Sequence, residues 1–400
     1  MTENDRSKSQ KMTETKTARN SKSAHGKQLP GAIAYRMPAE WEPHESTWLA
    51  WPHFRGDWPG KFEPIPWVYA EIIRNLSRHE RVDLIVNDAN WEKRATAILE
   101  KAGALNENVR FHRWRTDRVW TRDSGCIFLT RDLENDTPSL LALHFQFNAW
   151  AKYPNFKYDE KVGERIAKTA GIRVLQPLSV VSLNDSLHNK HRVVLEGGSI
   201  DVNGTGTLLT TEECLLSTTQ QRNPTMDRAA YERMFAEYFD VQSVIWLECG
   251  IAGDDTHGHV DDITRFVAPN KVITMIEPDA RNENYAALNA NLGRLKNARS
   301  ADGHRLEIVE IPMPRPVVFE GRQLPASYAN FYIANGAVLV PIFNDPNDRI
   351  ALNTLAGLFP SREIVPIYSG DLIWGFGALH CMTQQQPGAQ LISTAGRENS

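Results

Sequence analysis

The chain has 400 residues, of which 41% are hydrophobic and 24% charged, and its formal net charge is −4. This composition is typical of a soluble globular protein, and the lack of a basic excess argues against general nucleic-acid binding. No stretch approaches the ~18 consecutive apolar residues of a membrane-spanning helix, so no membrane span is expected. The slight negative charge favours a small cationic substrate.

Four cysteines are spread along the chain and form no CxxC pair: Cys126, Cys214, Cys249 and Cys381. This spacing predicts neither a disulfide framework nor a thiolate zinc cage. A reducing cytoplasm is therefore the expected location.

Residues 1–30 contain almost no large apolar side chains and carry seven Lys and Arg against three Asp and Glu. Such a segment cannot bury enough surface to offset the entropy of ordering, so a disordered polar tail is expected. It lacks the apolar region of ~7 to 15 residues that a secretory signal needs. A transit or nucleic-acid-binding tail and a start at Met12 are the alternatives. Residues 31–400 are expected to form a single catalytic domain.

Helix-like and strand-like segments alternate along this domain. Apolar residues at helical spacing predict a helix over 68–79, and the β-branched run 82–87 predicts a buried strand. A second helix is expected over 91–103, ended by Gly103, and a second strand over 109–114. The alternation indicates an α/β protein.

The same order recurs down the chain. Further helices are expected over 159–170, 226–240, 282–296 and 346–358, and each is followed by a strand and later by a polar loop. The loops recur every ~50 to 75 residues, which indicates a repeated supersecondary unit. Five such units in a ring would bring five polar loops to one axis. The pattern therefore predicts a single central active site.

The last of these loops contains a candidate nucleophile, Cys381, which follows Gly375 and Gly377 and adjoins His380. Glycines permit unusual backbone angles and the close approach of a ligand. Most buried free cysteines are inert, and a nucleophilic thiol needs a base, which can come from a distant part of the chain. His259 is the candidate partner.

The stretch DDTHGHVDDITRF, residues 254–266, places two histidines among four carboxylates. A strand-like alternation would put His257, His259 and Asp261 on one face. The order resembles the HxHxD zinc signature of metallo-β-lactamase-like hydrolases, so a zinc-dependent hydrolase is one hypothesis, and the closure of a surface loop is another. The next histidine of that signature is replaced by Asp262, which depletes the three or four ligands that zinc needs.

Two further carboxylates, Asp123 in VWTRDSG and Glu196 in LEGGSIDVNG, lie at the ends of apolar runs. A charge there is costly unless it is paired or meets a ligand. The alternatives are ordinary surface charges or a pair between Asp123 and Arg122. A cysteine, a histidine and several carboxylates are together what hydrolysis of a guanidinium group requires, because carboxylates bind its N–H groups by charge-assisted hydrogen bonds.

Seven motifs between Met37 and Pro387 resemble the agmatine deiminase and Porphyromonas-type peptidylarginine deiminase family, within the guanidine-modifying pentein superfamily. They are MPAEWEPHESTWLAWP, WTRDSG, FNAWAKY, LEGGSIDVNGTGTLLTTEECLL, DDTHGHVDDITRF, NFYIANGAVLVPIFNDPND and GALHCMTQQQP. The resemblance implies the pentein fold, an α/β propeller of five ββαβ-type units with pseudo-fivefold symmetry. It also implies a cysteine hydrolase that uses no metal and no cofactor.

The resemblance further implies a role for each matched residue. Cys381 is the implied nucleophile, and His259 is the implied general acid and base. Asp123 and Asp261 are the implied guanidinium-binding carboxylates, and Glu196 is the implied acidic partner near the histidine and the substrate. The expected reaction converts agmatine and water into N-carbamoylputrescine and ammonia through a covalent thiouronium on the cysteine.

Trp120, close to Asp123, is the implied wall for the alkyl chain of the substrate. Three departures from agmatine deiminases concern the wall of the pocket. GFGALHC, residues 375–381, replaces the expected GGGNIHC, Asp201 replaces a frequent histidine, and FNAW is followed by AKYPNFKYD instead of a second Gly-rich stretch. Arginine, peptidyl-arginine or another guanidino compound is therefore the alternative substrate, and an amidinotransferase is an alternative enzyme. A homodimer is a candidate assembly, and neither nucleic acid nor a membrane is an expected partner.

Overall fold

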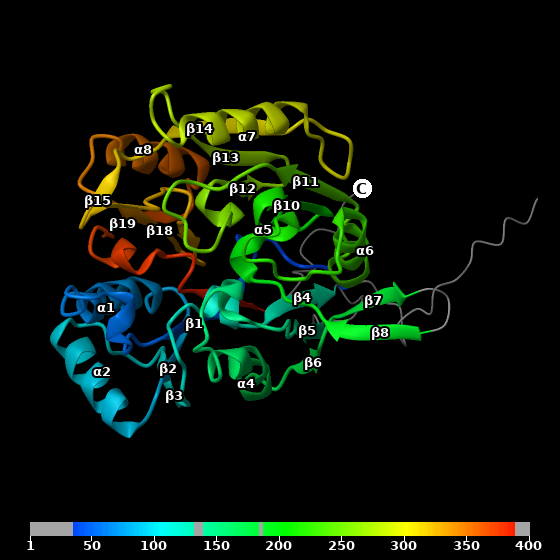
Figure 1. Cartoon of the computed structure of the whole chain (residues 1–400). Coiled ribbons are helices and arrows are strands. Elements are labelled where there is room, and N and C mark those ends of the chain that lie inside the picture. Colours follow the sequence, from blue (N-terminus) through cyan, green and yellow to red (C-terminus); the bar gives the residue numbers. More distant parts are fainter. Residues whose placement is uncertain (1–34, 132–138, 184–186, 389–400) are drawn as a thin grey trace, which may run out of the picture. The chain divides into compact units, whose positions relative to one another are not determined.

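The computed structural model describes residues 35–131, 139–183 and 187–388 (Figure 1). The tail predicted over residues 1–30 lies outside these ranges. The described residues belong to one compact unit, Ala34–Ser400. Among them, no helix combines the length and the apolar content that a bilayer crossing needs.

Five sheets in the described part of the chain share one strand order, in which a middle strand has an antiparallel neighbour on one side and a parallel neighbour on the other. The first sheet has a further parallel strand. Its β20 comes from the far end of the sequence and pairs with β1. The sheets contain, in turn (Figure 1), β20 (Gln384–Pro387), β1 (His44–Ala50), β2 (Arg81–Val86) and β3 (Val109–Arg113); β4 (Ile127–Arg131), β5 (Ser139–Leu143) and β6 (Arg173–Leu175); β9 (Asp201–Val202), β10 (Thr207–Thr211) and β11 (Ser243–Leu247); β12 (Thr264–Ala268), β13 (Lys271–Ile276) and β14 (Glu307–Pro312); β17 (Tyr332–Ile333), β18 (Ala337–Ile342) and β19 (Glu363–Tyr368).

Every parallel pair in these sheets is joined by a crossover that contains a helix, as a parallel connection generally requires. The crossover helices are α1 (Ile65–Leu76), α2 (Ala89–Lys101), α4 (Val162–Thr169), α5 (Glu212–Leu216) with α6 (Arg228–Phe239), α7 (Tyr285–Asn297) and α8 (Asp348–Leu358). The predicted mixed α/β class is therefore confirmed.

Short elements and two-stranded ribbons complete the described fold. The ribbons are β7 (Leu178–Leu183) with β8 (Leu187–Arg192), and β15 (Val317–Phe319) with β16 (Arg322–Leu324). The short helices are α3 (Thr121–Ser124) and the 3-10 turns η1 (Arg55–Asp57), η2 (Ala149–Ala151), η3 (Asp159–Lys161), η4 (Gly197–Ser199), η5 (Val260–Asp262) and η6 (Leu372–Gly375). Several of them carry the polar residues singled out in the sequence.

The predicted helices and strands are confirmed to within about three residues, and local chemistry explains their ends. Helix α1 begins earlier than the predicted 68–79, because prolines at Pro64 and Pro66 are tolerated at a helix start. Helix α2 begins after Asp88, whose side chain accepts hydrogen bonds from the backbone N–H groups of Asn90 and Trp91. It is followed by Gly103 with φ +61°, a conformation that favours glycine.

One local prediction is wrong. The strand-like alternation expected around His259 is absent, since η5 begins directly after this residue and β12 starts only at Thr264. The chain turns there instead of extending, yet the side chains of His259 and Asp261 still lie close together, with Nδ1 3.9 Å from Oδ1.

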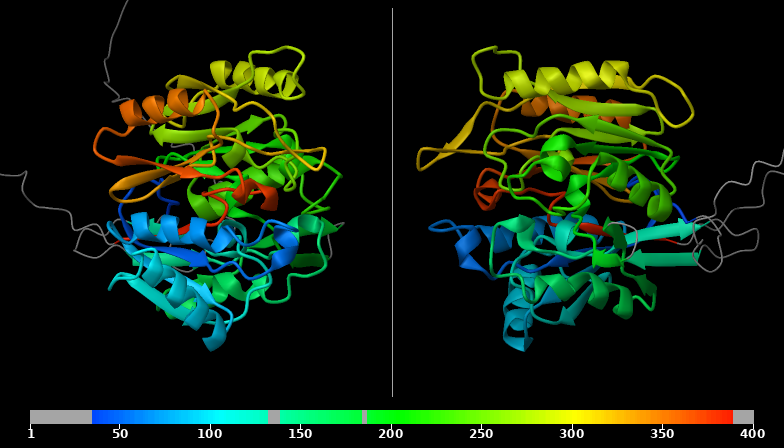
Figure 2. Two further views of the ribbon diagram at one scale, coloured as in Figure 1. Left: turned by 90° about the vertical axis from the view of Figure 1, so that its left-hand side faces the viewer. Right: turned by 45° about the vertical axis from the view of Figure 1, so that its right-hand side comes forward.

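The helices pack against more than one sheet. In α1, the side chains of Ile72, Ile73 and Leu76 are fully buried, and the helix contacts β2 of its own sheet and β18 and β19 of another. In the same way α7 contacts β13 and β11, and α8 contacts β19 and β14. Figure 2 shows α7 in yellow and α8 in orange along these strands. Each fully buried aliphatic side chain contributes about 1.5–3 kcal/mol, so such helices hold neighbouring sheets together.

Candidate active site

Cys381 lies in the lining of a pocket that is partly open to solvent. Trp120, Asp123 and Trp150 line the same pocket, and so do the charged residues Asp57, Arg118 and Asp255. The pocket therefore joins a thiol, aromatic walls and buried charges.

Asn330 holds Cys381 in place. The Asn330 Nδ2 group donates a hydrogen bond of 3.0 Å to Cys381 Sγ, and its Oδ1 atom accepts one of 3.0 Å from the backbone N–H of His380. A Cβ atom on Gly377 would lie 2.6 Å from the Trp120 ring and 3.2 Å from Cys381 Cβ. Glycine is thus required where the loop passes between the thiol and the tryptophan, as the sequence suggested.

Burial raises the pKa of the Cys381 thiol well above its ordinary value, and the charges of Asp261, Asp262 and Asp123 raise it further. The hydrogen bond from Asn330 acts in the opposite direction. The thiol is therefore protonated when no cation is bound. A cation between the carboxylates would lower the pKa and favour the thiolate.

His259 is buried between two carboxylates. Its Nδ1 atom lies 3.9 Å from Asp123 Oδ2 and 3.9 Å from Asp261 Oδ1. Neither ring nitrogen has a hydrogen-bond partner among the described residues. Burial lowers the pKa of His259, but the charges of Asp123 and Asp261 and the neighbouring Cys214 outweigh it and leave the pKa well above its ordinary value. The ring is thus a protonated group with free N–H donors.

Asp123 stands in the short helix α3 and is held on both oxygens. The Trp150 indole Nε1 donates 2.9 Å to Oδ2, and the backbone N–H of Gly198 donates 3.0 Å to Oδ1. Burial raises the pKa of Asp123, which the charge of His259 opposes. Trp150 itself has φ +59°, a strained angle for a tryptophan that is typical of functional sites.

Gly198 explains why the sequence reads EGGS at this place. A Cβ atom there would lie 2.6 Å from His259 Nδ1 and 3.0 Å from an oxygen of both Asp123 and Asp261. No side chain fits between these three groups. The backbone of η4 therefore forms the floor under the two carboxylates and the histidine.

Asp261 depends on a buried chain of charges that the sequence did not reveal. His380 Nδ1 lies 2.7 Å from Asp261 Oδ2, and His380 Nε2 lies 2.7 Å from Glu40 Oε2. Glu40 Oε2 also lies 3.0 Å from an Arg265 nitrogen. Burial raises the pKa of Asp261, but the His380 hydrogen bond and nearby positive charges leave it below its ordinary value. Asp261 is thus ionised, and its Oδ1 atom lacks a partner within the described residues.

The sequence carried only a weak signal for this chain. His380 adjoins Cys381 and Glu40 lies in the first motif, but nothing in their spacing indicates that one contacts the other. Asp201, expected at the pocket wall, is not in the pocket lining; it accepts a hydrogen bond from Arg265 Nε. That expectation is wrong, because the buried guanidinium holds Asp201 away from the pocket.

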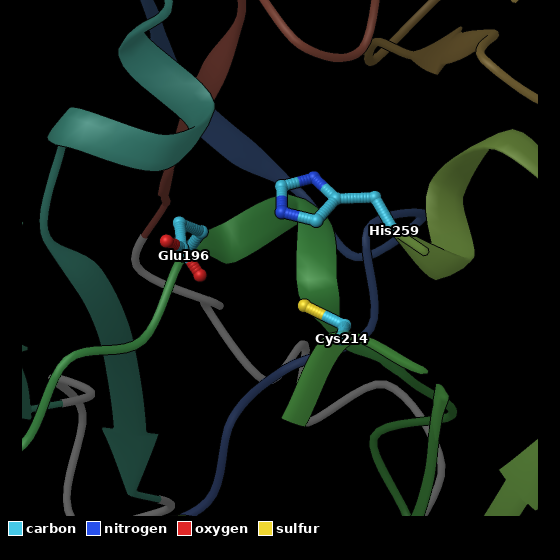
Figure 3. Close-up of side chains that lie close together, drawn as sticks. All are labelled: Glu196, Cys214 and His259. Atoms are coloured by element: carbon cyan, nitrogen blue, oxygen red, sulfur yellow. The ribbon is translucent and has the colours of Figure 1, made fainter. Parts of the chain in front are cut away.

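Glu196 is a further buried carboxylate close to His259. Arg222 Nε donates a 3.1 Å hydrogen bond to Glu196 Oε1, both side chains are fully buried, and Oε2 has no partner among the described residues. The ligand atoms of Glu196, Cys214 and His259 all lie within 4.8 Å of one another (Figure 3). These three residues are therefore the group in the described chain that could hold a metal ion.

The predicted HxHxD zinc site is not assembled. His257 has φ +65°, its Nδ1 atom lies 3.6 Å from Glu213 Oε1, and its Nε2 atom lies 3.2 Å from Ser217 Oγ. The group that could hold a metal includes neither His257 nor Asp261. The left-handed turn at His257 separates the two histidines that the signature would bring together.

Trp120 lines the pocket, and its role as the wall for the alkyl chain stays a prediction. Its side chain is 5% exposed, and its ring centroid lies 5.8 Å from that of Trp58. The two indoles are tilted by 41° to each other, and their contact gives an apolar surface beside the thiol.

A protonated thiol, an imidazole with free nitrogens and two buried carboxylates define a candidate cysteine hydrolase for a cationic substrate. The sequence model of the Porphyromonas-type peptidyl-arginine deiminases matches residues 36–387, and the chain belongs to this family. The family predicted from the seven motifs is therefore confirmed.

Similar proteins cover nearly the whole chain. An agmatine deiminase from Pseudomonas aeruginosa (strain LESB58) is 34% identical over 381 residues, which are 90% of this chain and 97% of that protein. The solved agmatine deiminase of Enterococcus faecalis has a TM-score of 0.78 at 28% identity and covers 90% of this chain and 99% of its own. A cysteine-to-serine variant of the C. jejuni agmatine deiminase with substrate bound has a TM-score of 0.75 at 28% identity, with coverage of 90% and 98%.

Proposed function

We propose that the protein is a guanidine deiminase that converts agmatine and water into N-carbamoylputrescine and ammonia. The observation that carries this proposal is the placement of the Cys381 thiol 3.7 Å from Asp261 Oδ2, in a pocket that Asp123 also lines. A guanidinium held by both carboxylates has its central carbon next to the thiol. The similarity to proteins named agmatine deiminase supports agmatine as the substrate.

The first half of the reaction forms a covalent intermediate. Asp123 and Asp261 accept hydrogen bonds from the guanidinium N–H groups, and the bound positive charge lowers the pKa of the Cys381 thiol, which loses its proton to solvent. The sulfur attacks the central carbon and forms a tetrahedral adduct. His259 donates a proton to one nitrogen, which leaves as ammonia, and the product is an S-alkylthiouronium on Cys381.

The second half hydrolyses this intermediate. His259, now deprotonated, accepts a proton from water, and the hydroxide adds to the same carbon. Collapse of the second tetrahedral adduct breaks the carbon–sulfur bond, transfers the hydroxyl proton to the departing sulfur of Cys381 and releases the ureido product. Glu196 serves as the acidic partner near His259. No step requires a metal ion or another cofactor.

We propose that Asp57 binds the ammonium group at the other end of agmatine. Asp57 is 5% exposed and lines the pocket; Arg118 donates to its Oδ1, while Oδ2 has no partner in the described part of the chain. Asp255 is already occupied, because Lys152 and Tyr153 donate to its two oxygens over 2.7 and 2.6 Å. The free oxygen for a second cation is thus on Asp57, with Trp120 as the wall for the alkyl chain.

We also propose that the five sheets form the ring of a pentein propeller. The contacts of α7 with β11 and β13, of α8 with β14 and β19, and of α1 with β18 and β2 support this arrangement, since each helix joins consecutive sheets. The single catalytic domain over 31–400, the cytoplasmic location and the homodimer stay predictions.

The function is tested by assaying purified protein with excess chelator present. Agmatine should release ammonia and a ureido product, and Cys381→Ala should lower the rate by at least about a thousandfold. A panel of agmatine, arginine, peptidyl-arginine and an amine acceptor separates the alternatives, including an amidinotransferase. Activity that is lost with chelator and restored by zinc would favour the metallohydrolase instead.

A further inference from the structure

We propose that Glu196, Cys214 and His259 form a binding site for a thiophilic divalent cation of the Zn²⁺ type, and that occupation of this site switches the deiminase off. The inhibition rests on the proposed function, because it requires His259 to move protons. The binding itself does not.

The three ligands come from separate parts of the chain and converge. Glu196 precedes η4, Cys214 stands in α5, and His259 precedes η5. In Figure 3 the sulfur of Cys214 and the ring of His259 point toward the carboxylate of Glu196. Their ligand atoms lie within 4.8 Å of one another, whereas the bond lengths of tetrahedral zinc require roughly 3.3–3.8 Å. Small side-chain rotations therefore close the site.

Two of the three residues have buried donor atoms without a hydrogen-bond partner among the described residues. Both nitrogens of His259 and the Oε2 atom of Glu196 are buried and have no hydrogen-bond partner within the described residues. Buried polar atoms without a partner are uncommon, and a ligand often explains them. The other oxygen of Glu196 is held by Arg222, which fixes the carboxylate with Oε2 left over.

The chemistry of the donors selects the ion. A thiolate and an imidazole prefer zinc and related metals over magnesium and calcium, which favour oxygen ligands. The carboxylates of Asp123 and Asp261 lie 3.9 Å from His259 Nδ1 and add negative charge around the site. The charge of Arg222 opposes binding, but it is already paired with Glu196.

Metal binding and catalysis exclude each other here. The ion bonds to a lone pair of His259, so Cys214 and His259 each give up a proton to solvent. The nitrogen that coordinates the ion can neither donate a proton to the leaving ammonia nor accept one from water. Cys381 is not among the ligands, so inhibition at this site does not involve the nucleophile.

The binding is tested with cobalt(II) as a spectroscopic probe for zinc. Cobalt bound to a thiolate gives a sulfur-to-metal charge-transfer absorption in the near ultraviolet. We expect this band with the wild-type protein, Cys381→Ser and Cys249→Ser, and its loss in Cys214→Ser. Glu196→Gln should weaken binding at least tenfold. A band that survives in Cys214→Ser, or that is lost in Cys381→Ser, would overturn the proposal.

The inhibition is tested in the same variants. Zinc should inhibit the wild type, magnesium should not, and chelator should restore the rate. In Cys214→Ser the zinc concentration for half-inhibition should rise at least tenfold, whereas in Cys249→Ser, a matched cysteine outside the cluster, it should stay unchanged. Equal inhibition of both variants would sink the site. If the wild type shows no activity even with chelator, the proposed function fails, and the cobalt spectra still decide whether the metal site exists.

Discussion

At the level of single residues, the site contains acidic groups with different tasks because their surroundings differ. Asp261 is kept ionised by His380, whereas burial raises the pKa of Asp123. His259 lies between them and keeps both nitrogens free. Around the same thiol, Asp261 is thus a carboxylate that stays ionised, Asp123 is a carboxyl group with a raised pKa, and His259 carries protons.

His380 is expected to act as a positioning residue through Asp261. In His380→Ala, Asp261 loses the hydrogen bond that lowers its pKa, so that pKa rises. The acidic limb of the pH profile of kcat/KM should then move to higher pH, because Asp261 must be ionised to bind the guanidinium. Loss of a hydrogen bond to a charged group costs about 1.5–3 kcal/mol, so kcat/KM should fall roughly 10- to 100-fold. An unmoved acidic limb would show that His380 has a structural role only.

Asp57 is expected to determine the selectivity for a substrate with a terminal ammonium. Asp57→Asn should lower kcat/KM for agmatine roughly 10- to 100-fold, the effect of losing a charged hydrogen-bond partner. Butylguanidine, which lacks the amine, should be turned over at an unchanged rate. If both substrates lose the same factor, Asp57 does not contact the amine.

The same residue should make agmatine turnover depend on pH. Burial raises the pKa of Asp57 to about 7, the charge of Asp255 also raises it, and that of Arg118 lowers it. Below this pH the carboxyl group is protonated and no longer attracts an ammonium. The ratio of kcat/KM for agmatine to that for butylguanidine should therefore fall as the pH drops through about 7, and should be flat in Asp57→Asn.

At the level of elements, short turns carry the side chains of the site, and the helices keep these turns in position. A substitution of Gly198 in η4 tests how closely the site is packed. Gly198→Ala puts a methyl group 2.6 Å from His259 Nδ1, so kcat should fall at least about a hundredfold, since displacements of ~1 Å at a reacting centre have such effects. Gly293→Ala in α7, where nothing lies within 4 Å, should leave kcat unchanged. Full activity of Gly198→Ala would refute the close packing of the site.

The elements also show what a sequence can reveal. Helical periodicity predicted α1 and α2 closely, because an amphipathic helix must repeat its buried positions. The turn at His257 was missed, because residues with positive φ leave no periodic trace. The contacts of Glu40 with His380 and of Asn330 with Cys381 were missed for another reason: they join residues that are far apart in the chain, and only the folded sheets bring them together.

At the level of the whole molecule, several helices pack against two sheets at once. Loss of a buried side chain from such a helix should therefore lower the free energy of unfolding. Ile73 in α1 is fully buried, so Ile73→Ala should lower the free energy of unfolding by about 2–5 kcal/mol. Trp67→Ala in the same helix removes a side chain that is 49% exposed, and it should change the free energy of unfolding by less than about 0.5 kcal/mol. Urea denaturation measures both; similar effects of the two variants would contradict the packing of α1.

The covalent intermediate on Cys381 can be detected by acid quenching followed by peptide mass spectrometry. Protein quenched during turnover of agmatine should carry an adduct on the peptide that contains Cys381, with the mass of agmatine minus ammonia. Cys381→Ser should show neither this adduct nor ammonia release. Ammonia release by Cys381→Ser at the wild-type rate, without any adduct on the wild-type peptide, would rule out a covalent intermediate on Cys381.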